Sequence, residues 1–171
     1  PAWEGNWAAV SKWFTKEQFQ QLRALFHYPY GGPQIVVRAD SGITKISDLN
    51  GKVVNLGAQG STGARYSLII LKHHGLQEGS FTPSFLTDSN AADALKDGTV
   101  NCFVTYQLPG AAVVMNVDSV HPIRLLPIEK EAMPGILNDL RGYMPREWAA
   151  NSYPNMVNNK PVQSIATNLT W

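Results

Sequence analysis

The residues best suited to hold a ligand lie in one glycine-rich loop, residues 55–67, with the sequence NLGAQGSTGARYS. A strand-like run leads into this loop, and a helical pattern begins at about Thr62. Glycines let a ligand approach the backbone closely, and the N–H groups at a helix start favour negative charge. The pattern therefore predicts an anion site built from backbone N–H groups and hydroxyls, at Gly60, Ser61, Thr62 and Gly63.

A cation, Arg65, stands in the first turn of the predicted helix. Arginine is unfavourable there, because the N-terminal end of a helix already carries partial positive charge. A bound anion would remove the conflict, and the guanidinium would add charge or a bidentate contact. The alternative is an ordinary capped helix whose Arg65 side chain points into water. The loop lacks the lysine of GxxxxGK[ST] and the glycine spacing of a dinucleotide motif, so both nucleotide-binding motifs are disfavoured.

A second candidate loop, residues 105–109 (TYQLP), also joins a predicted strand to a predicted helix. The phenol of Tyr106 and the amide of Gln107 stand at the strand's end, where they can fix a polar ligand. Ordinary loop residues would show the same pattern, so this alternative stays open.

The remaining reactive side chains do not form a catalytic or metal-binding pattern. His73 and His74 are adjacent and point to different faces of a helix, which makes them a poor chelating pair. His27 and His121 are isolated, and neither candidate loop contains a histidine, so no Ser/His/Asp arrangement is predicted. Cys102 is the only cysteine, which excludes an internal disulfide and a cysteine-based zinc site. We expect no enzyme activity, no metal and no cofactor.

Composition narrows the class of protein. Hydrophobic residues make up 44% of the 171 residues and charged residues 16%, which is typical of a globular chain. The net charge is +1 and no basic block occurs, so no nucleic-acid partner is expected. Apolar runs are too short for a membrane span. The chain begins at Pro1 and contains no signal peptide, so we expect a processed product or a fragment.

Periodicity and turn residues predict an α/β chain. From residue 52 strands and helices alternate, which favours a parallel or mixed sheet with helices on both faces and ligands at the carboxyl ends of the strands. Residues 29–33 (PYGGP) predict a turn, and residues 143–159 predict irregular structure. The expected strands are 22–28, 34–38, 52–56, 83–86, 100–105, 123–126 and 163–169, and the expected helices are 62–74, 91–96, 109–115 and 129–140.

The order of several short motifs resembles the TAXI-type solute-binding proteins of TRAP transporters. No single motif is strong, but the succession covers about residues 20–171. Three later stretches, ALKDGTVNCFVTYQLPGAA, IRLLPIEKEA and NSYPN, are similar to the same family. The earlier motifs are Tyr28-Pro29, Val37-Arg38, Asp40-Ser41-Gly42-Ile43, Asp48-Leu49-Asn50-Gly51-Lys52-Val53 and Gly60-Ser61-Thr62-Gly63.

The resemblance implies a fold and a function. It implies one lobe of a periplasmic-binding-protein-like fold, with residues 1–38 as a remnant of the first lobe and hinge strand, 39–160 as the second α/β lobe and 161–171 as the return hinge strand. It also implies a periplasmic protein, not an enzyme, that captures a small anionic solute such as an acidic amino acid or dicarboxylate for TRAP membrane subunits. Gly60, Ser61, Thr62, Gly63, Arg65, Tyr106 and Gln107 would bind the solute.

Other functions remain open on the same fold. A binding protein of an ABC importer or a ligand-sensing domain would suit the sequence nearly as well. An enzyme such as a transferase would need a convergent acid, base or nucleophile set, and the two loops lack one.

A single lobe would leave apolar surface and strand edges exposed. An aromatic N-terminal segment (Trp3, Trp7, Trp13 and Phe14) and the strands at residues 34–38 and 163–169 would lack neighbours. We therefore expect a homodimer of the truncated chain, and weak ligand binding by its one-walled cleft.

Overall fold

The computed structural model describes residues 15, 17 and 27–170. The aromatic N-terminal segment and most of the strand expected at residues 22–28 lie outside the described residues. The strands are β1 (His27–Arg38), β2 (Val53–Asn55), β3 (Thr82–Ser84), β4 (Cys102–Gln107), β5 (Ile123–Leu125), β6 (Tyr143–Trp148) and β7 (Val162–Thr170). The helices are α3 (Thr62–His73), α4 (Asp88–Lys96), α5 (Ala112–Asp118) and α6 (Met133–Asp139), with 3₁₀ helices η2 (Ala39–Ser41) and η3 (Ile46–Leu49).

These strands form one mixed sheet in the order β3-β2-β4-β1-β7-β6, and β5 also pairs with β1. Strand β2 runs parallel to β3 and to β4, whereas β1 runs antiparallel to β4, β5 and β7. The predicted mixed sheet is therefore confirmed. Because β2, β3 and β4 point the same way, their carboxyl ends meet at one edge of the sheet.

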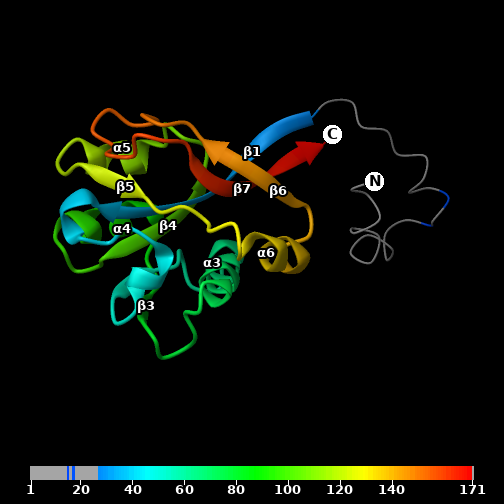
Figure 1. The fold of residues 1–171 in the computed structure, drawn as a ribbon, viewed down its shortest axis with the longest axis horizontal. Coiled ribbons are helices and arrows are strands. Elements are labelled where there is room, and N and C mark those ends of the chain that lie inside the picture. Colours follow the sequence, from blue (N-terminus) through cyan, green and yellow to red (C-terminus); the bar gives the residue numbers. More distant parts are fainter. Residues whose placement is uncertain (1–14, 16, 18–26, 171) are drawn as a thin grey trace.

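Alternation along the strands builds a separate core on each face of the sheet. In β1, Ile35 and Val37 pack with α3 and α6, whereas Val36 between them packs with α4 and α5. Figure 1 shows α3 beside α6, and α4 near α5 on the opposite side of the sheet. Phe103 of β4 is fully buried in the second core and its neighbours Cys102 and Val104 in the first, which confirms helices on both faces.

The predicted turn at residues 29–33 is wrong, because β1 runs straight through it as one strand of 12 residues. Pairing with β7 continues on both sides of a bulge, from Pro29 opposite Asn168 to Gly31 opposite Thr167. Gly31 has φ +115°, a conformation that glycine adopts easily, so the bulge is absorbed without reversing the chain.

The glycine next to this bulge allows two backbones to approach closely. A Cβ atom placed on Gly32 would lie 1.8 Å from the carbonyl oxygen of Ile165 in β7. A glycine is therefore required where β1 crosses β7.

The prediction of irregular structure at residues 143–159 is also wrong in part, because β6 pairs with β7 over its whole length. Pro145 is tolerated since β6 is the outermost of the described strands, and none of them pairs with the other side of its backbone. Helix starts also differ from prediction. Helix α4 begins earlier, at Asp88, and α5 begins after Gly110, whose φ of +90° interrupts the helical path that follows Pro109.

Local signals set the ends of α3 and of β1 as predicted. Gly75 has φ +80°, and the N–H of Leu76 donates to the carbonyl of Leu71 at 3.0 Å, which is a Schellman cap with a buried apolar residue after it. A turn follows β1 directly, in which η2 ends at Gly42 with φ +74°.

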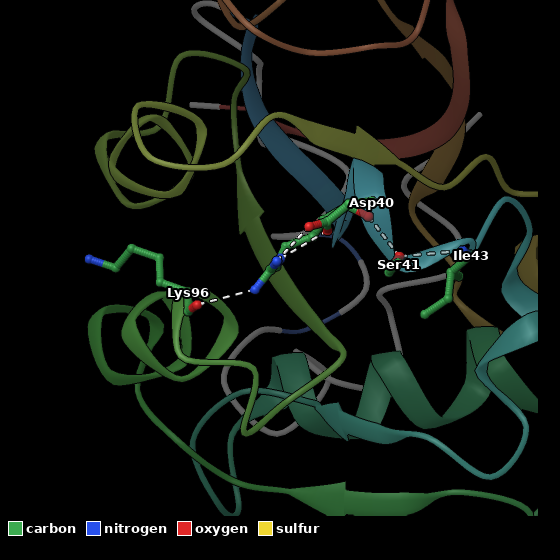
Figure 2. A network of polar contacts seen from close by, with 5 residues as sticks. Asp40, Ser41, Ile43 and Lys96 are labelled. Atoms are coloured by element: carbon green, nitrogen blue, oxygen red, sulfur yellow. Dashed lines mark hydrogen bonds and ion pairs between the residues drawn. The ribbon is translucent and has the colours of Figure 1, made fainter.

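An arginine ties the end of β1 to the end of α4. Arg38 donates from Nε to Asp40 at 3.0 Å and from Nη1 to the carbonyl of Lys96 at 3.3 Å. Ser41 Oγ accepts from the N–H of Ile43 at 3.3 Å and donates to the Arg38 carbonyl at 2.6 Å (Figure 2). Because a cation is favoured at a helix C-terminus, this network fixes the turn against α4.

Acid is expected to destabilise the fold through His74. Its Nδ1 lies 2.7 Å from the Ile70 carbonyl and its Nε2 accepts from the Glu129 N–H at 3.1 Å, an arrangement that fits a neutral ring. Burial lowers the pKa of His74 from its ordinary 6.5. The stabilisation is thus fully present above the unfolded-state pKa and is lost as pH falls through the lower folded-state pKa.

Urea denaturation at several pH values measures this effect. The free energy of unfolding should fall between about pH 7 and about pH 5, the range in which histidine titrates. The fall should be smaller in His74→Gln, whose amide does not titrate. An equal fall in the variant would contradict a role for His74.

Candidate functional site

A pocket of about 330 Å³ lies at the edge where β2, β3 and β4 end, and it is called the edge pocket below. Both loops singled out from the sequence contribute to it, together with the loop after β3. Its lining residues are Leu56, Gly57, Ala58, Ser61, Gly63, Thr87, Asp88, Val104 and Tyr106.

The first wall of the edge pocket is the start of α3. Ser61 is the N-cap, and its Oγ accepts from the N–H of Ala64 at 3.1 Å. The first N–H groups of a helix have no partner within the helix, so those of Thr62 and Gly63 are suited to an anionic ligand atom. The main role of the serine hydroxyl is thus to cap α3, whose first N–H groups are the donors available to a ligand.

Glycine at position 63 brings the two predicted loops together. A Cβ atom there would lie 3.2 Å from Cδ2 of the Tyr106 ring. The Tyr106 hydroxyl lies 3.3 Å from Ser67 Oγ, and that oxygen also donates to the Gly63 carbonyl at 2.9 Å. Burial raises the pKa of Tyr106, so the phenol stays neutral. Tyr106 is one of the residues that line the pocket.

The opposite wall carries a carboxylate, Asp88, which the sequence analysis did not assign to the site. Its Oδ2 accepts from Thr105 Oγ1 at 2.6 Å and from Gln107 Nε2 at 2.8 Å. Gln107 is therefore placed behind Asp88, and it is not among the lining residues of the pocket. A signal was available, because Asp88 follows β3 at the same sheet edge as both predicted loops.

A buried polar pair supports the second loop from behind. Gln34 is 1% exposed, and its Nε2 donates to the carbonyls of Gln107 at 3.1 Å and Leu108 at 3.2 Å. Its Oε1 accepts from the Tyr153 hydroxyl at 2.5 Å. The position of Tyr106 and Gln107 thus depends on side chains from β1 and from the segment after β6.

The other predicted residues face a neighbouring hollow of about 400 Å³, called the outer groove. Arg65 is exposed and lines this groove with the half-exposed side chains of Leu68 and Phe85. Gly60 and Thr62 line the groove as well, and Ser61 borders both spaces. The structure therefore brings Ser61, Gly63 and Tyr106 together and places Arg65 outside their pocket.

Metal-binding side chains do not gather in the described part of the chain. No group of three or more histidine, cysteine, aspartate or glutamate residues there is placed to hold a metal ion. Cys102 is fully buried, and burial raises the pKa of its thiol. No helix among the described residues has the length and apolar character needed to cross a membrane.

Comparison with known proteins gives a family and a fold. The family model described as the NMT1-like family matches residues 2–171. The periplasmic aliphatic sulphonate binding protein SsuA from Escherichia coli has a TM-score of 0.50 and 19% identity, over 82% of this chain and 38% of that chain. The comparison with curated proteins finds no match.

Two further structures are similar over part of their length. The alkanesulfonate-binding protein SsuA from Xanthomonas axonopodis pv. citri shows 24% identity and a TM-score of 0.48, over 61% of this chain and 36% of that chain. The probable amino-acid ABC transporter extracellular-binding protein YtmK from Bacillus subtilis shows 19% identity and a TM-score of 0.44, over 90% and 54%. This chain therefore spans well under two thirds of each binding protein, and the likeness to the Escherichia coli protein shows the fold of one part of it.

Proposed function

This chain belongs to the NMT1-like family, and we propose from that premise that it is an extracytoplasmic solute-binding protein that captures a small acid. The edge pocket carries the proposal. It joins the N-terminal N–H groups of α3 to the ring of Tyr106, at the carboxyl edge of parallel strands where ligands of open α/β sheets bind. Its lining residues include one carboxylate, Asp88, and no histidine, cysteine or lysine.

Transport is the proposed purpose of binding. The motif order that resembles TAXI-type proteins supports delivery of the acid to the membrane subunits of a TRAP transporter. Delivery to an ABC importer is the second candidate, and the fold supports it at least equally. In either case the solute would be enclosed when a second lobe closes over the pocket.

The same proposal assigns parts of the chain to lobes. Residues 39–160 would form one lobe, and the segments 1–38 and 161–171 would belong to the hinge and the other lobe. Antiparallel pairing of β1 with β7 supports this division, because it places the two segments side by side.

A titration followed by amide NMR tests the binding site. L-glutamate and succinate, added at millimolar concentration, should shift the amide signals of residues 61–64 and of Tyr106. The double variant Ser61→Ala/Gly63→Val should bind more weakly by about 1–3 kcal/mol, because losing the N-cap loosens the first turn of α3 and costs one hydrogen bond from its N–H groups to the charged ligand. Valine at position 63 would also displace the Tyr106 ring.

Two control variants outside the edge pocket test whether the loss of binding is specific to the pocket. Ser119→Ala removes a hydroxyl at the end of α5, where it donates to the Asn116 carbonyl at 2.9 Å, and should leave binding unchanged. Arg65→Gln removes a charge from the outer groove, and should weaken binding less than the double variant while lowering its dependence on salt. Equal affinity in the double variant and the unaltered chain would place the ligand elsewhere.

A further inference from the structure

We propose that Asp88 makes the edge pocket selective for acids that also carry a protonated amine, so that amino acids and amino sulfonates bind more tightly than the corresponding acids without the amine. This inference rests on the proposed function, because it concerns the same pocket. It uses the negative charge of Asp88 to specify which small acids the pocket prefers.

The charge of the lining residues is the first argument. Of the nine residues that line the edge pocket, Asp88 is the one with a charged side chain. Arg65 lies in the outer groove and is not among them. A dicarboxylate could place one acid group at the start of α3, but its second acid group would then face a carboxylate with no cation in the pocket to offset it.

The orientation of the carboxylate is the second argument. Thr105 and Gln107 both donate to Oδ2 of Asp88, at 2.6 and 2.8 Å, so the side chain is held from behind by two bonds to one oxygen. The other oxygen, Oδ1, keeps its capacity to accept a bond from a ligand. An ammonium group donates such bonds and cancels the charge, which gives a stronger interaction than two neutral groups do.

The two walls thus favour opposite charges. The N–H groups at the start of α3 favour an anionic atom, and Asp88 on the other wall favours a cationic one. A small zwitterion satisfies both walls at once. Under this inference Gln107 and Thr105 are positioning residues, which orient Asp88 rather than touch the solute.

Two pairs of acids that differ only by an amine give the test. The probes are L-glutamate against glutarate and taurine against ethanesulfonate, titrated into the 171-residue chain and followed by amide NMR. In each pair the amine-bearing acid should bind at least about tenfold more tightly, the ratio expected for one charge-assisted hydrogen bond. Asp88→Asn should bring both ratios close to one, since asparagine keeps an acceptor for Thr105 and Gln107 but lacks the charge.

A control variant on the same helix tests whether Asp88 acts by contact with the solute or only through the negative charge that it adds to α4. Asp93→Asn removes the same charge from an exposed position of α4, where Asp93 pairs with Lys96 at 2.8 Å, and should leave both ratios unchanged. Dispersed amide signals verify the fold of each variant. If Asp88→Asn does not fold, the ratios in the unaltered chain decide: ratios near one, or a preference for glutarate, overturn the inference.

The remaining outcomes distinguish the two proposals. Equal binding within each pair, or a ratio unaltered by Asp88→Asn, would overturn the role of Asp88 and leave acid binding in place. Absence of any shift at residues 61–64 and Tyr106 with all four acids would overturn the proposed function, and the inference with it.

Discussion

Replacing Gly32 with alanine should destabilise the fold by more than about 4 kcal/mol, which is exceptional for one methyl group. The added Cβ would lie 1.8 Å from the carbonyl oxygen of Ile165 and 2.9 Å from its carbonyl carbon. Both are backbone atoms of β7, so no side-chain rotation relieves the collision. Either β7 separates from β1 or the bulge at Gly31 rearranges, and the free energy of unfolding from urea denaturation measures the loss.

Another glycine provides the comparison. Gly51 has φ +71° and open space around its Cβ direction, so alanine there meets no atom and costs on the order of 1 kcal/mol through backbone strain alone. If Gly32→Ala were no more destabilising than Gly51→Ala, the close approach of β1 and β7 would be contradicted.

The second large effect is expected at Gln34. Methionine has a similar length but no polar atoms in the amide's place, so Gln34→Met would leave the Tyr153 hydroxyl and the carbonyls of Gln107 and Leu108 without their partner. Each buried polar group left unpaired costs about 1–3 kcal/mol, so three of them predict a loss of at least about 3 kcal/mol in total. The amide signals of residues 106–108 should also shift, because this amide fixes that backbone.

A double-mutant cycle tests whether Gln34 and Tyr153 act together. Tyr153→Phe alone removes the hydroxyl donor and leaves Gln34 Oε1 unpaired. The variant with both changes should be less destabilised than the sum of the two single variants, since no partner of that bond remains unsatisfied. Strict additivity would show that the 2.5 Å contact contributes nothing.

The sequence predicted those parts of the fold whose signals are local. The apolar run and the Gly75 cap of α3 act within a few residues, and so does the glycine turn after β1. The PYGGP stretch misled because its turn-forming residues are local, whereas the partner that keeps them extended, β7, comes more than a hundred residues later. Strand β6 was not predicted, because the prolines and asparagines of residues 143–159 are typical of loops. Its position at the edge of the described sheet, which the local sequence does not show, makes Pro145 acceptable.

The candidate site was predicted to a similar extent. Ser61, Gly63 and Tyr106 stand where strands end, and the alternation of strands and helices predicts that such loops share an edge. Asp88 was not predicted, because nothing next to it in sequence shows that Thr105 and Gln107 hold its side chain. The expectation for Arg65 came from the helix dipole, which acts along the axis and does not determine the direction in which an exposed side chain points.

The central place of β1 has a consequence for synthesis of the chain. Its pairing partners β4, β5 and β7 all lie later in the sequence, and the first of them begins at Cys102. While the chain emerges, the apolar run Ile35-Val36-Val37 lacks the pairing partners that the structure describes until β4 has left the ribosome, and β7 follows later still. Contacts so distant in sequence form slowly, and an unpaired apolar strand associates readily with other chains. Newly made molecules should therefore depend on a chaperone that shields β1 until β7 has been synthesised.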